Sequence, residues 1–356
     1  MVSTHPHHPT DYSQTPLVVT WEVTQACSLT CDHCRAAAQP DRHPDELTTD
    51  EGRMLIDQIS SFGDPTPIFV ISGGDPLERP DLSELIDHAT DLGMRVGVTP
   101  APTHRLTPET LEQFVAAGVH RIALSLDGAT PDRHDTFRGE AGSFDTIEAA
   151  ARHASDIGLD LQINTTVTAT TMSDLPDIAD LVEAFGAVMW EVFFLVPIGR
   201  GTELEQLTPL EAEELLHWLY HRQHDAPFRL ITVEAPQYRR VAIEAARAEG
   251  RNPPRVGSTG DGRGFVFVSH TGEVYPSGFL PISAGNVRDD SIVDIYRDAP
   301  TFIHLRDSDR LGGHCGSCRY RAVCGGSRAR AFAATGDPMA ADPLCAYADE
   351  AGSHAG

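Results

Sequence analysis

The chain has 356 residues, 40% of them hydrophobic, which is enough for a barrel-sized packed domain with an appendage. Its formal net charge of −25 disfavours nucleic acid and anionic membrane surfaces as partners, because both bind basic surfaces. The sequence has no apolar run long enough to cross a bilayer, so no membrane span is predicted.

The N-terminal residues 1–15 are polar and lack the apolar core of a secretory signal, so we expect a disordered tail and a cytoplasmic protein. All 27 basic residues are arginine. An acidic, lysine-free chain suits a salt-loving host or a GC-rich genome, and the sequence does not choose between them. The negative net charge is therefore evidence about the solution in which the protein works, and not about the charge of its substrate.

From residue 16 to about residue 225, apolar strands alternate with amphipathic helices. The strands are predicted at 17–24, 67–76, 94–102, 119–128, 159–168 and 187–200. The helices are predicted at 48–62, 81–93, 107–118, 143–158, 174–186 and 208–223. Thr48 and Glu51 have the spacing of a capping box, and Thr107 precedes a proline at the first helical position. Continuous apolar strands separated by helices are typical of a parallel sheet, either doubly wound or a partial barrel.

The C-terminal third has a different pattern. Residues 226–262 are expected to form a linker of helix and loop, because 250–263 is rich in proline, glycine and arginine. Residues 264–281 predict a hairpin that turns at Thr271 and Gly272, and a short helix follows at 291–300. The last part of the chain, to about residue 350, is rich in cysteine.

Three of the seven cysteines, Cys27, Cys31 and Cys34, lie just after the first predicted strand. Their spacing also fits one face of a helix, where free cysteine packs as a small apolar residue. The intervening residues are mostly polar, which favours a loop with converging thiols. Zinc would need His33 as a fourth ligand, and this residue lies inside the last Cys-x-x-Cys. A [4Fe–4S] cluster normally takes four thiolates, so three thiolates would leave one iron open to a ligand.

The spacing Cys27-x3-Cys31-x2-Cys34 after the first strand resembles that of the radical S-adenosylmethionine (SAM) enzymes. The resemblance implies an α/β fold, a partial (β/α)6 TIM-like barrel over residues 16–225. It also implies that the open iron binds SAM and that one electron cleaves SAM to a 5′-deoxyadenosyl radical. That radical would take hydrogen from a substrate.

Further segments resemble positions where members of this family bind SAM, and all lie at carboxyl ends of predicted strands. The resemblance assigns the SAM amino group to the GGDP stretch, and the ribose or methionine part to two strand ends. It assigns the adenine edge to the sixth strand and the carboxylate to an arginine. Ordinary turns, or a surface arginine, are the alternatives. The residues are Gly73, Gly74, Asp75, Pro76, Ser125, Asp127, Asn164, Val196 and Arg138.

The second group of cysteines resembles the SPASM/twitch extension of these enzymes, here over residues 263–350. Four thiolates close a cluster completely, and the resemblance implies one auxiliary [4Fe–4S] cluster, with zinc as the alternative. The four are Cys315, Cys318, Cys324 and Cys345. Ser277 and Ser327 stand where relatives often have cysteine, so a second auxiliary cluster is not expected.

Within the superfamily, the chain resembles the tetrapyrrole-modifying branch, the haem-synthase-like decarboxylases and the haem d1 maturation enzymes. The first hypothesis is oxidative decarboxylation of tetrapyrrole propionates, with ferredoxin or flavodoxin as the low-potential electron donor. The alternatives are a maturase of a ribosomally made peptide and a non-enzymatic iron–sulfur sensor. Four arginines beside the motifs are candidates to bind propionates: Arg35, Arg200, Arg328 and Arg330. Asp127, Glu191 and Tyr275 are candidates for a catalytic acid or base, and none stands out.

Overall fold

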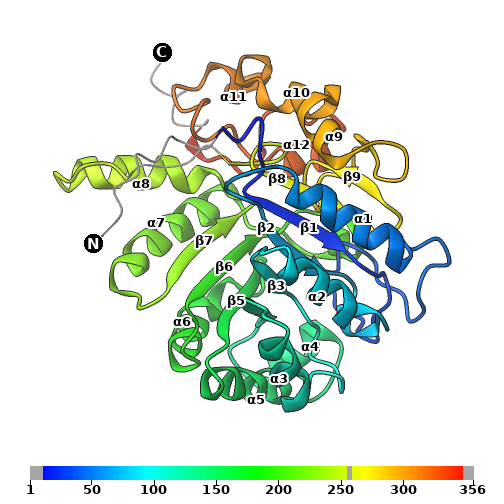
Figure 1. Ribbon diagram of the computed structural model, residues 1–356. Coiled ribbons are helices and arrows are strands. Elements are labelled where there is room, and N and C mark those ends of the chain that lie inside the picture. The colour runs from blue at the N-terminus through cyan, green and yellow to red at the C-terminus, as the bar shows by residue number, and fades with distance from the viewer. Residues whose placement is uncertain (1–10, 255–258, 348–356) are drawn as a thin grey trace, which may run out of the picture.

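A computed structural model describes residues 11–254 and 259–347, and within them one ten-stranded sheet runs through the molecule (Figure 1). Its strand order is β10-β9-β8-β1-β2-β3-β4-β5-β6-β7. The strands are β1 (Val18–Glu22), β2 (Ile68–Ser72), β3 (Val96–Val98), β4 (Arg121–Ser125), β5 (Asp160–Val167), β6 (Met189–Phe194), β7 (Arg229–Val233), β8 (Phe265–Val268), β9 (Glu273–Tyr275) and β10 (Gly285–Asn286). Strands β1 to β7 are parallel neighbours in chain order, so their carboxyl ends lie along one edge.

Helices follow the strands and cover the outer face of the curved sheet (Figure 1). In the first two-thirds of the described chain they are α1 (Thr49–Ser60), α2 (Leu82–Asp91), α3 (Pro108–Ala116), α4 (Pro131–Arg138), α5 (Ser143–Asp156), α6 (Leu175–Ala184), α7 (Pro209–Asp225) and α8 (Gln237–Ala248). The C-terminal helices are α9 (Ile292–Asp298), α10 (Pro300–Arg306), α11 (Gly313–Ser317) and α12 (Arg328–Thr335). The fold is therefore a partial α/β barrel with a C-terminal extension, as the resemblance implied, but with β7 as a seventh parallel strand beyond the six expected.

Caps at the helix starts agree with the sequence patterns. Thr48 and Glu51 form a reciprocal capping box at α1, and Thr208 and Glu211 form another at α7. The side chain of Thr107 caps α3, whose first residue is a proline. Each cap satisfies backbone N–H groups that have no partner within the helix, so these helices start at positions that the local sequence determines.

Alternate residues of the strands are buried against the helices. In β5 every second side chain is buried, from Leu161 to Val167, and the intervening ones are partly exposed. This differs from the predicted continuous burial on both faces. The inner face carries polar or small residues, among them Gln162 and Asn164. A barrel of this kind leaves its interior to a ligand instead of filling it with side chains.

The segment 226–262, expected to be a linker, continues the barrel. Strand β7 pairs in parallel with β6 along five residues, from Arg229 to Val233, and α8 packs against α7. The predicted hairpin is present, with β8 antiparallel to β9 around Thr271 and Gly272. Strand β8 also pairs in parallel with β1, so the C-terminal extension shares the sheet of the barrel. Sequence-local patterns do not encode this pairing between strands about 245 residues apart.

Residues 1–10 and 348–350 of the predicted terminal segments lie outside the described residues. Residues 11–15 form a turn that packs on α9, because the hydroxyl of Tyr296 donates to the carbonyl of Tyr12. The prediction of a disordered tail therefore does not hold for these five residues. No helix in the described part of the chain has the length and hydropathy that a bilayer crossing requires.

Candidate active site

The loop that carries Cys27, Cys31 and Cys34 is held from three sides. The N–H of Cys27 donates to the carbonyl of Gln39, 2.7 Å away, which closes the loop on itself. The N–H of Asp32 donates to the carbonyl of Phe137 in α4. From the loop after β6, Nε of Arg200 donates to the carbonyl of Cys31 at 2.8 Å. The cysteine loop therefore keeps its conformation through elements that follow three different strands.

Gly73 and Gly74 pack against the backbone that leads into this loop. A Cβ on Gly74 would lie 2.3 Å from the carbonyl oxygen of Ala26, and one on Gly73 would lie 2.9 Å from that of Thr24. The N–H of Gly74 donates to Thr24. In the described structure, the carbonyls of both glycines accept no hydrogen bond and remain free for an ammonium donor. The glycines are thus required first for packing against β1 and the cysteine loop.

The side chain of Asp75 has a structural role. It is fully buried, accepts from the hydroxyl of Thr103 at 2.8 Å, and caps the short turn that starts at Pro76. Its carboxylate therefore holds the loop after β3 and does not face an open cavity. The expectation for this stretch concerned its backbone, and the Asp75 side chain, which is bonded to Thr103, fixes the turn that presents that backbone.

The three thiols need a positive partner to be present as thiolates. Burial raises the pKa of Cys27 to about 12, and nearby Asp75 and the other two thiols act in the same direction. Backbone N–H groups point at two sulfurs: Leu29 donates to Cys27 at 3.4 Å and Ala38 to Cys34 at 3.5 Å. N–H···S bonds of this kind are typical of iron–sulfur sites, so the donor set fits a cluster with three protein ligands.

Arg138 lies between this loop and the end of β4. Its Nη2 is 2.5 Å from Oδ2 of Asp127, and its Nη1 is 3.7 Å from the sulfur of Cys31. Both side chains of the ion pair are buried. The Arg138 guanidinium lowers the pKa of Asp127 against the opposing effect of burial, and the N–H of Thr166, which donates to Oδ1 of Asp127 at 2.6 Å, acts in the same direction. Arg138 is therefore neither a surface residue nor a free cation, but its Nε has no partner among the described residues.

Two histidines lie beside this ion pair and are neutral. Burial lowers the pKa of His33 and of His134 to about 4, and Arg138 adds to the effect in both. The ring of His33 stacks on Phe137 with 4.8 Å between centroids. Nδ1 of His134 accepts from the N–H of Asp127 at 3.1 Å. These contacts fix the end of β4 next to the cysteine loop.

The inner face of the barrel brings together residues from three neighbouring strands. Ser125, Asn164 and Glu191 are in register across β4, β5 and β6. Oδ1 of Asn164 accepts from Gln162, which leaves its amide donor toward the interior. Burial raises the pKa of Glu191 to about 7, against the weaker pull of Arg121 and Arg229. Val196 lies apart from this row, buried with Leu280 and Ala329 of the C-terminal extension.

The second group of cysteines lines a cavity of about 290 Å³ in the C-terminal extension. Burial raises the pKa of Cys324 to about 12 and that of Cys345 to about 11. Within the described residues, no three His, Cys, Asp or Glu side chains converge in a way that would hold a single metal ion. Four thiols that line one cavity are the ligand number of a closed cluster, with one thiolate for each iron. The cysteines are Cys315, Cys318, Cys324 and Cys345.

The two serines that replace expected cysteines have other roles. The hydroxyl of Ser327 accepts from the N–H of Arg330 as the N-cap of α12 and donates to Glu234 at 2.5 Å. The hydroxyl of Ser277 accepts from the N–H of Phe279. The hydroxyl of Ser327 therefore both accepts and donates within the protein, whereas that of Ser277 accepts one bond.

Four arginines proposed for propionate binding have other partners. Arg330 is fully buried, pairs with Asp342 at 3.3 Å, and donates to carbonyls after β6 and β7. Arg328 donates to carbonyls of its own extension. Arg35 pairs with Glu22 at 2.9 Å, and Arg200 holds the cysteine loop. The contacts of Arg328 and Arg330, both buried, do not favour propionate binding by these two side chains. Nη2 of Arg200 is a buried donor that has no partner among the described residues.

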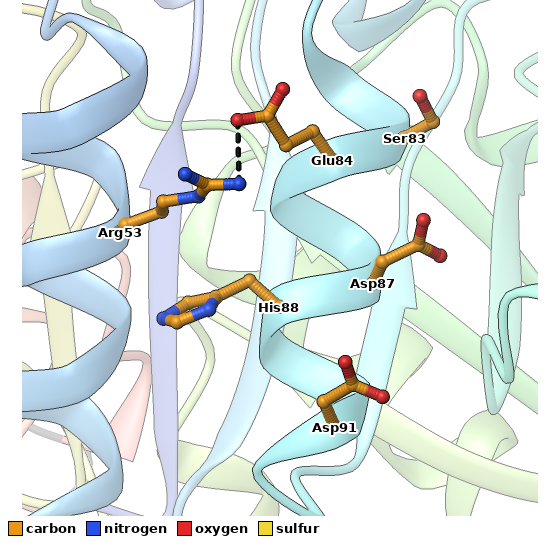
Figure 2. Close-up of a pocket in the computed structure, with 6 residues that line it drawn as sticks. All are labelled: Arg53, Ser83, Glu84, Asp87, His88 and Asp91. Atoms are coloured by element: carbon orange, nitrogen blue, oxygen red, sulfur yellow. Dashed lines mark ion pairs between the residues drawn. The ribbon is translucent and has the colours of Figure 1, made fainter.

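A separate groove lies on the outer helices, away from the thiols. Figure 2 shows it between α1 and α2, where Arg53 pairs with Glu84 at 2.7 Å and His88 faces α1. Its lining contains none of the predicted site residues. Exposed ion pairs of this kind contribute little free energy and do not by themselves make a site.

Helix α4 and the clamp by Arg200 were not predicted. The helix had a readable signal, because Thr130 caps it, Pro131 is its first residue and Gly139 ends it with φ of 67°. The contact of Arg200 with a cysteine 169 residues earlier had no local signal. Together, the thiol loop, the free glycine carbonyls and the polar inner face form one site at the carboxyl ends of the strands.

The profile of the Radical SAM superfamily matches residues 21–182, which contain the first three cysteines and the GGDP stretch. The chain belongs to this superfamily and is a radical SAM enzyme. It is 41% identical over 341 residues to "AdoMet-dependent heme synthase" of Methanosarcina barkeri, covering 93% of this chain and 97% of the relative. It is 40% identical to the protein of the same name from Nitratidesulfovibrio vulgaris, covering 95% of this chain and 94% of the relative.

More distant similarities agree on the fold. The chain is 32% identical to "Mycofactocin maturase MftC" of Mycobacterium ulcerans, covering 93% of this chain and 88% of that protein. The solved structure of Streptococcus suis SuiB bound to S-adenosylmethionine has a TM-score of 0.74, at 16% identity, over 94% of this chain and 78% of that one. At such low identity the structural likeness shows the fold alone, including the SPASM-type C-terminal extension.

Proposed function

We propose that this enzyme is an AdoMet-dependent heme synthase that converts propionate side chains of an iron tetrapyrrole to vinyl groups. The observation that carries the proposal is the 41% identity to a protein of that name over 93% of the chain. The two groups of cysteines, one with three thiols after β1 and one with four in the C-terminal extension, support it.

The chain's own residues define where the cofactors would bind. Cys27, Cys31 and Cys34 would hold a [4Fe–4S] cluster with one open iron, and the four C-terminal cysteines would hold a closed one. When bound, the first cluster and SAM supply a 5′-deoxyadenosyl radical that takes a hydrogen atom from the substrate. The carbonyls of Gly73 and Gly74, to which no hydrogen bond is made in the described structure, would receive the SAM amino group, as the resemblance implies.

We propose that the other parts of SAM bind along the inner face of the barrel. Ser125 and Asn164 present polar side chains beside one another for the ribose or methionine part of SAM. We also propose that the unpartnered Nε of Arg138 donates to the SAM carboxylate, and that the backbone at Val196 borders the adenine. The ion pair with Asp127 fixes the orientation of the Arg138 guanidinium.

The reaction needs no base that removes a proton from carbon, because the hydrogen leaves as an atom. The substrate carbon radical then loses carbon dioxide and one electron, and a carbon–carbon double bond forms. Because no proton is removed from carbon, the proposal does not require Glu191 or Tyr275 to act as a base in this step. A low-potential donor such as ferredoxin or flavodoxin and a cytoplasmic location are part of the proposal.

The test is anaerobic reconstitution with iron and sulfide, followed by incubation with SAM, dithionite and an iron porphyrin bearing four propionates. Formation of 5′-deoxyadenosine together with a porphyrin whose mass has fallen by carbon dioxide and hydrogen supports the proposal. Formation of 5′-deoxyadenosine with an unchanged porphyrin contradicts it. The 32% identity to a mycofactocin maturase favours a second arm with a ribosomal precursor peptide, in which a mass change would establish that alternative.

A further inference from the structure

Arg35 differs from the other three arginines that lie beside the cysteine motifs. Its side chain is 21% exposed and forms an ion pair with Glu22, with 2.9 Å between Nη2 and Oε2. No other carboxylate or hydrogen-bond acceptor among the described residues contacts its guanidinium. By contrast, the free donor of Arg200 is buried, and Arg328 and Arg330 are buried throughout. Of these four side chains, that of Arg35 is the one with donors open to a ligand.

The backbone of Arg35 is held directly after the last cysteine of the three-thiol loop. The N–H of Arg200 donates to the carbonyl of Cys34 at 3.0 Å. Gly199, with φ of 54°, packs on the same stretch, and a Cβ there would lie 2.4 Å from the carbonyl oxygens of Cys34 and Arg35. The side chain of Arg35 therefore starts from a fixed point next to the thiols.

Two neighbouring strands orient the guanidinium. Glu22 is the last residue of β1, and Phe267 lies in β8, with its ring centroid 4.3 Å from Cζ of Arg35. Nδ1 of His270 donates to Oε1 of Glu22 at 2.7 Å, so each oxygen of this carboxylate has one partner. Against the effect of burial, the contacts with Arg35 and His270 lower the pKa of Glu22, which stays ionised. The guanidinium is thus held at one nitrogen and on one face.

The segment after β9 leaves room beside the guanidinium. A Cβ on Gly278 would lie 3.1 Å from Nε of Arg35 and 3.2 Å from the ring of Phe267, so a larger residue would crowd both. The ring of Tyr275 is stacked on that of Phe267, with 6.3 Å between centroids, and is partly exposed. Aromatic rings next to an arginine with open donors suit a flat aromatic ligand that carries a carboxylate.

We propose that Arg35 binds a propionate carboxylate of the tetrapyrrole and thereby positions the ring of the substrate against the three-thiol loop. The inference rests on the proposed function. The guanidinium has five N–H donors in a planar fork, and Glu22 contacts Nη2 alone, which leaves Nη1 and Nε for the substrate. Because Arg35 directly follows Cys34, a carboxylate bound to it lies beside the loop that would hold the SAM-binding cluster.

The test is equilibrium binding, which needs neither SAM nor turnover. The reconstituted enzyme is titrated with an iron porphyrin bearing four propionates and with the tetramethyl ester of the same porphyrin, and absorbance gives both affinities. We expect the parent to prefer the acid. Arg35→Met should bind the acid at least about tenfold more weakly, because a charge-assisted hydrogen bond is lost, and the ester with little change. Arg35→Lys keeps the charge without the planar fork and should fall between the two.

The matched control is Arg53→Met, which breaks an ion pair of 2.7 Å on the outer helices and should behave as the parent. The same acid-to-ester preference in Arg35→Met as in the parent would overturn the inference, even if the parent decarboxylates the porphyrin. A preference that is lost in Arg35→Met, in a parent that does not decarboxylate, would support the inference and contradict the proposed function.

If Arg35→Met does not retain iron at the first centre, Gly278→Ala decides, because its Cβ would crowd Nε of Arg35 and the ring of Phe267. This variant should weaken binding of the acid more than binding of the ester. An equal effect on both ligands, or no effect on either, would refute the assignment.

Discussion

Arg138 and Asp127 form a buried ion pair with 2.5 Å between Nη2 and Oδ2, and the same guanidinium lies 3.7 Å from the sulfur of Cys31. This pair joins the end of β4 to the cysteine loop after β1. It brings two predicted site residues into contact with a third. It also explains why a buried arginine is tolerated next to Cys31, because the carboxylate of Asp127 balances the charge of the guanidinium.

The Asp127→Asn variant should be strongly destabilised, because it leaves the Arg138 charge buried and unpaired. Removing one partner of a buried pair costs about 3–5 kcal/mol in the free energy of unfolding. Urea denaturation of anaerobically purified protein measures the loss. The double variant Asp127→Leu, Arg138→Met is the control. It should be less destabilised than the single variant, and an additive effect would contradict the pairing argument.

Replacement of Cys31 by alanine should abolish 5′-deoxyadenosine formation, because two thiols cannot hold the SAM-binding cluster. Replacement of Cys318 by alanine should leave SAM cleavage in place and stop formation of the porphyrin product. Chromatography of both products from one anaerobic reaction separates the two outcomes. Equal loss of SAM cleavage in both variants would show that the two centres are not independent.

The Gly74→Ala variant should distort the entry to the cysteine loop. Its Cβ would lie 2.3 Å from the carbonyl oxygen of Ala26, which is backbone and has little freedom to move. Overpacking of this kind costs about 1–3 kcal/mol, and we expect less iron bound at the first centre. The matched control is Gly260→Ala, where a Cβ would meet nothing within 4 Å. Equal iron content and equal stability in the two variants would contradict the packing role.

Stability should fall as the pH decreases, in part through His134. Burial lowers its pKa in the folded protein from 6.5 to about 4, so the unfolded chain takes up the proton first. The stabilisation is fully present above pH 6.5 and is lost as the pH falls toward 4, by about 1.4 kcal/mol per pH unit. Urea midpoints at pH 7.5 and about 5.5 measure the slope.

The variant His134→Asn keeps an acceptor for the N–H of Asp127 and should show a smaller pH dependence than the parent. His104→Asn, at an exposed position, controls for the loss of a histidine. An unchanged slope in His134→Asn would mean that another group accounts for the pH dependence.

Apart from α4, the order of helices and strands up to α7 was predictable because its signals are local. Caps such as Thr107 and Thr208 bond to a residue three positions later in the chain. The spacing of apolar residues that marks a helix or strand can be read within a few turns. The chemistry of the two cysteine groups was predictable too, since ligand number and spacing are sequence properties. Strand β7 was missed because the nearby proline- and glycine-rich run suggested a linker. Its pairing with β6 makes it a barrel strand.

By itself, the sequence determined that an α/β barrel would carry a three-thiol loop at the end of its first strand and a four-thiol group near its C-terminus. The tertiary structure alone decided that β8 pairs with β1 and brings the extension into the same sheet. It also decided that Arg330 reaches a carbonyl 135 residues away, and that Arg138 pairs with Asp127. The physical reason is range: caps and periodicity act over a few residues, whereas the partner of a buried charge depends on how distant segments pack.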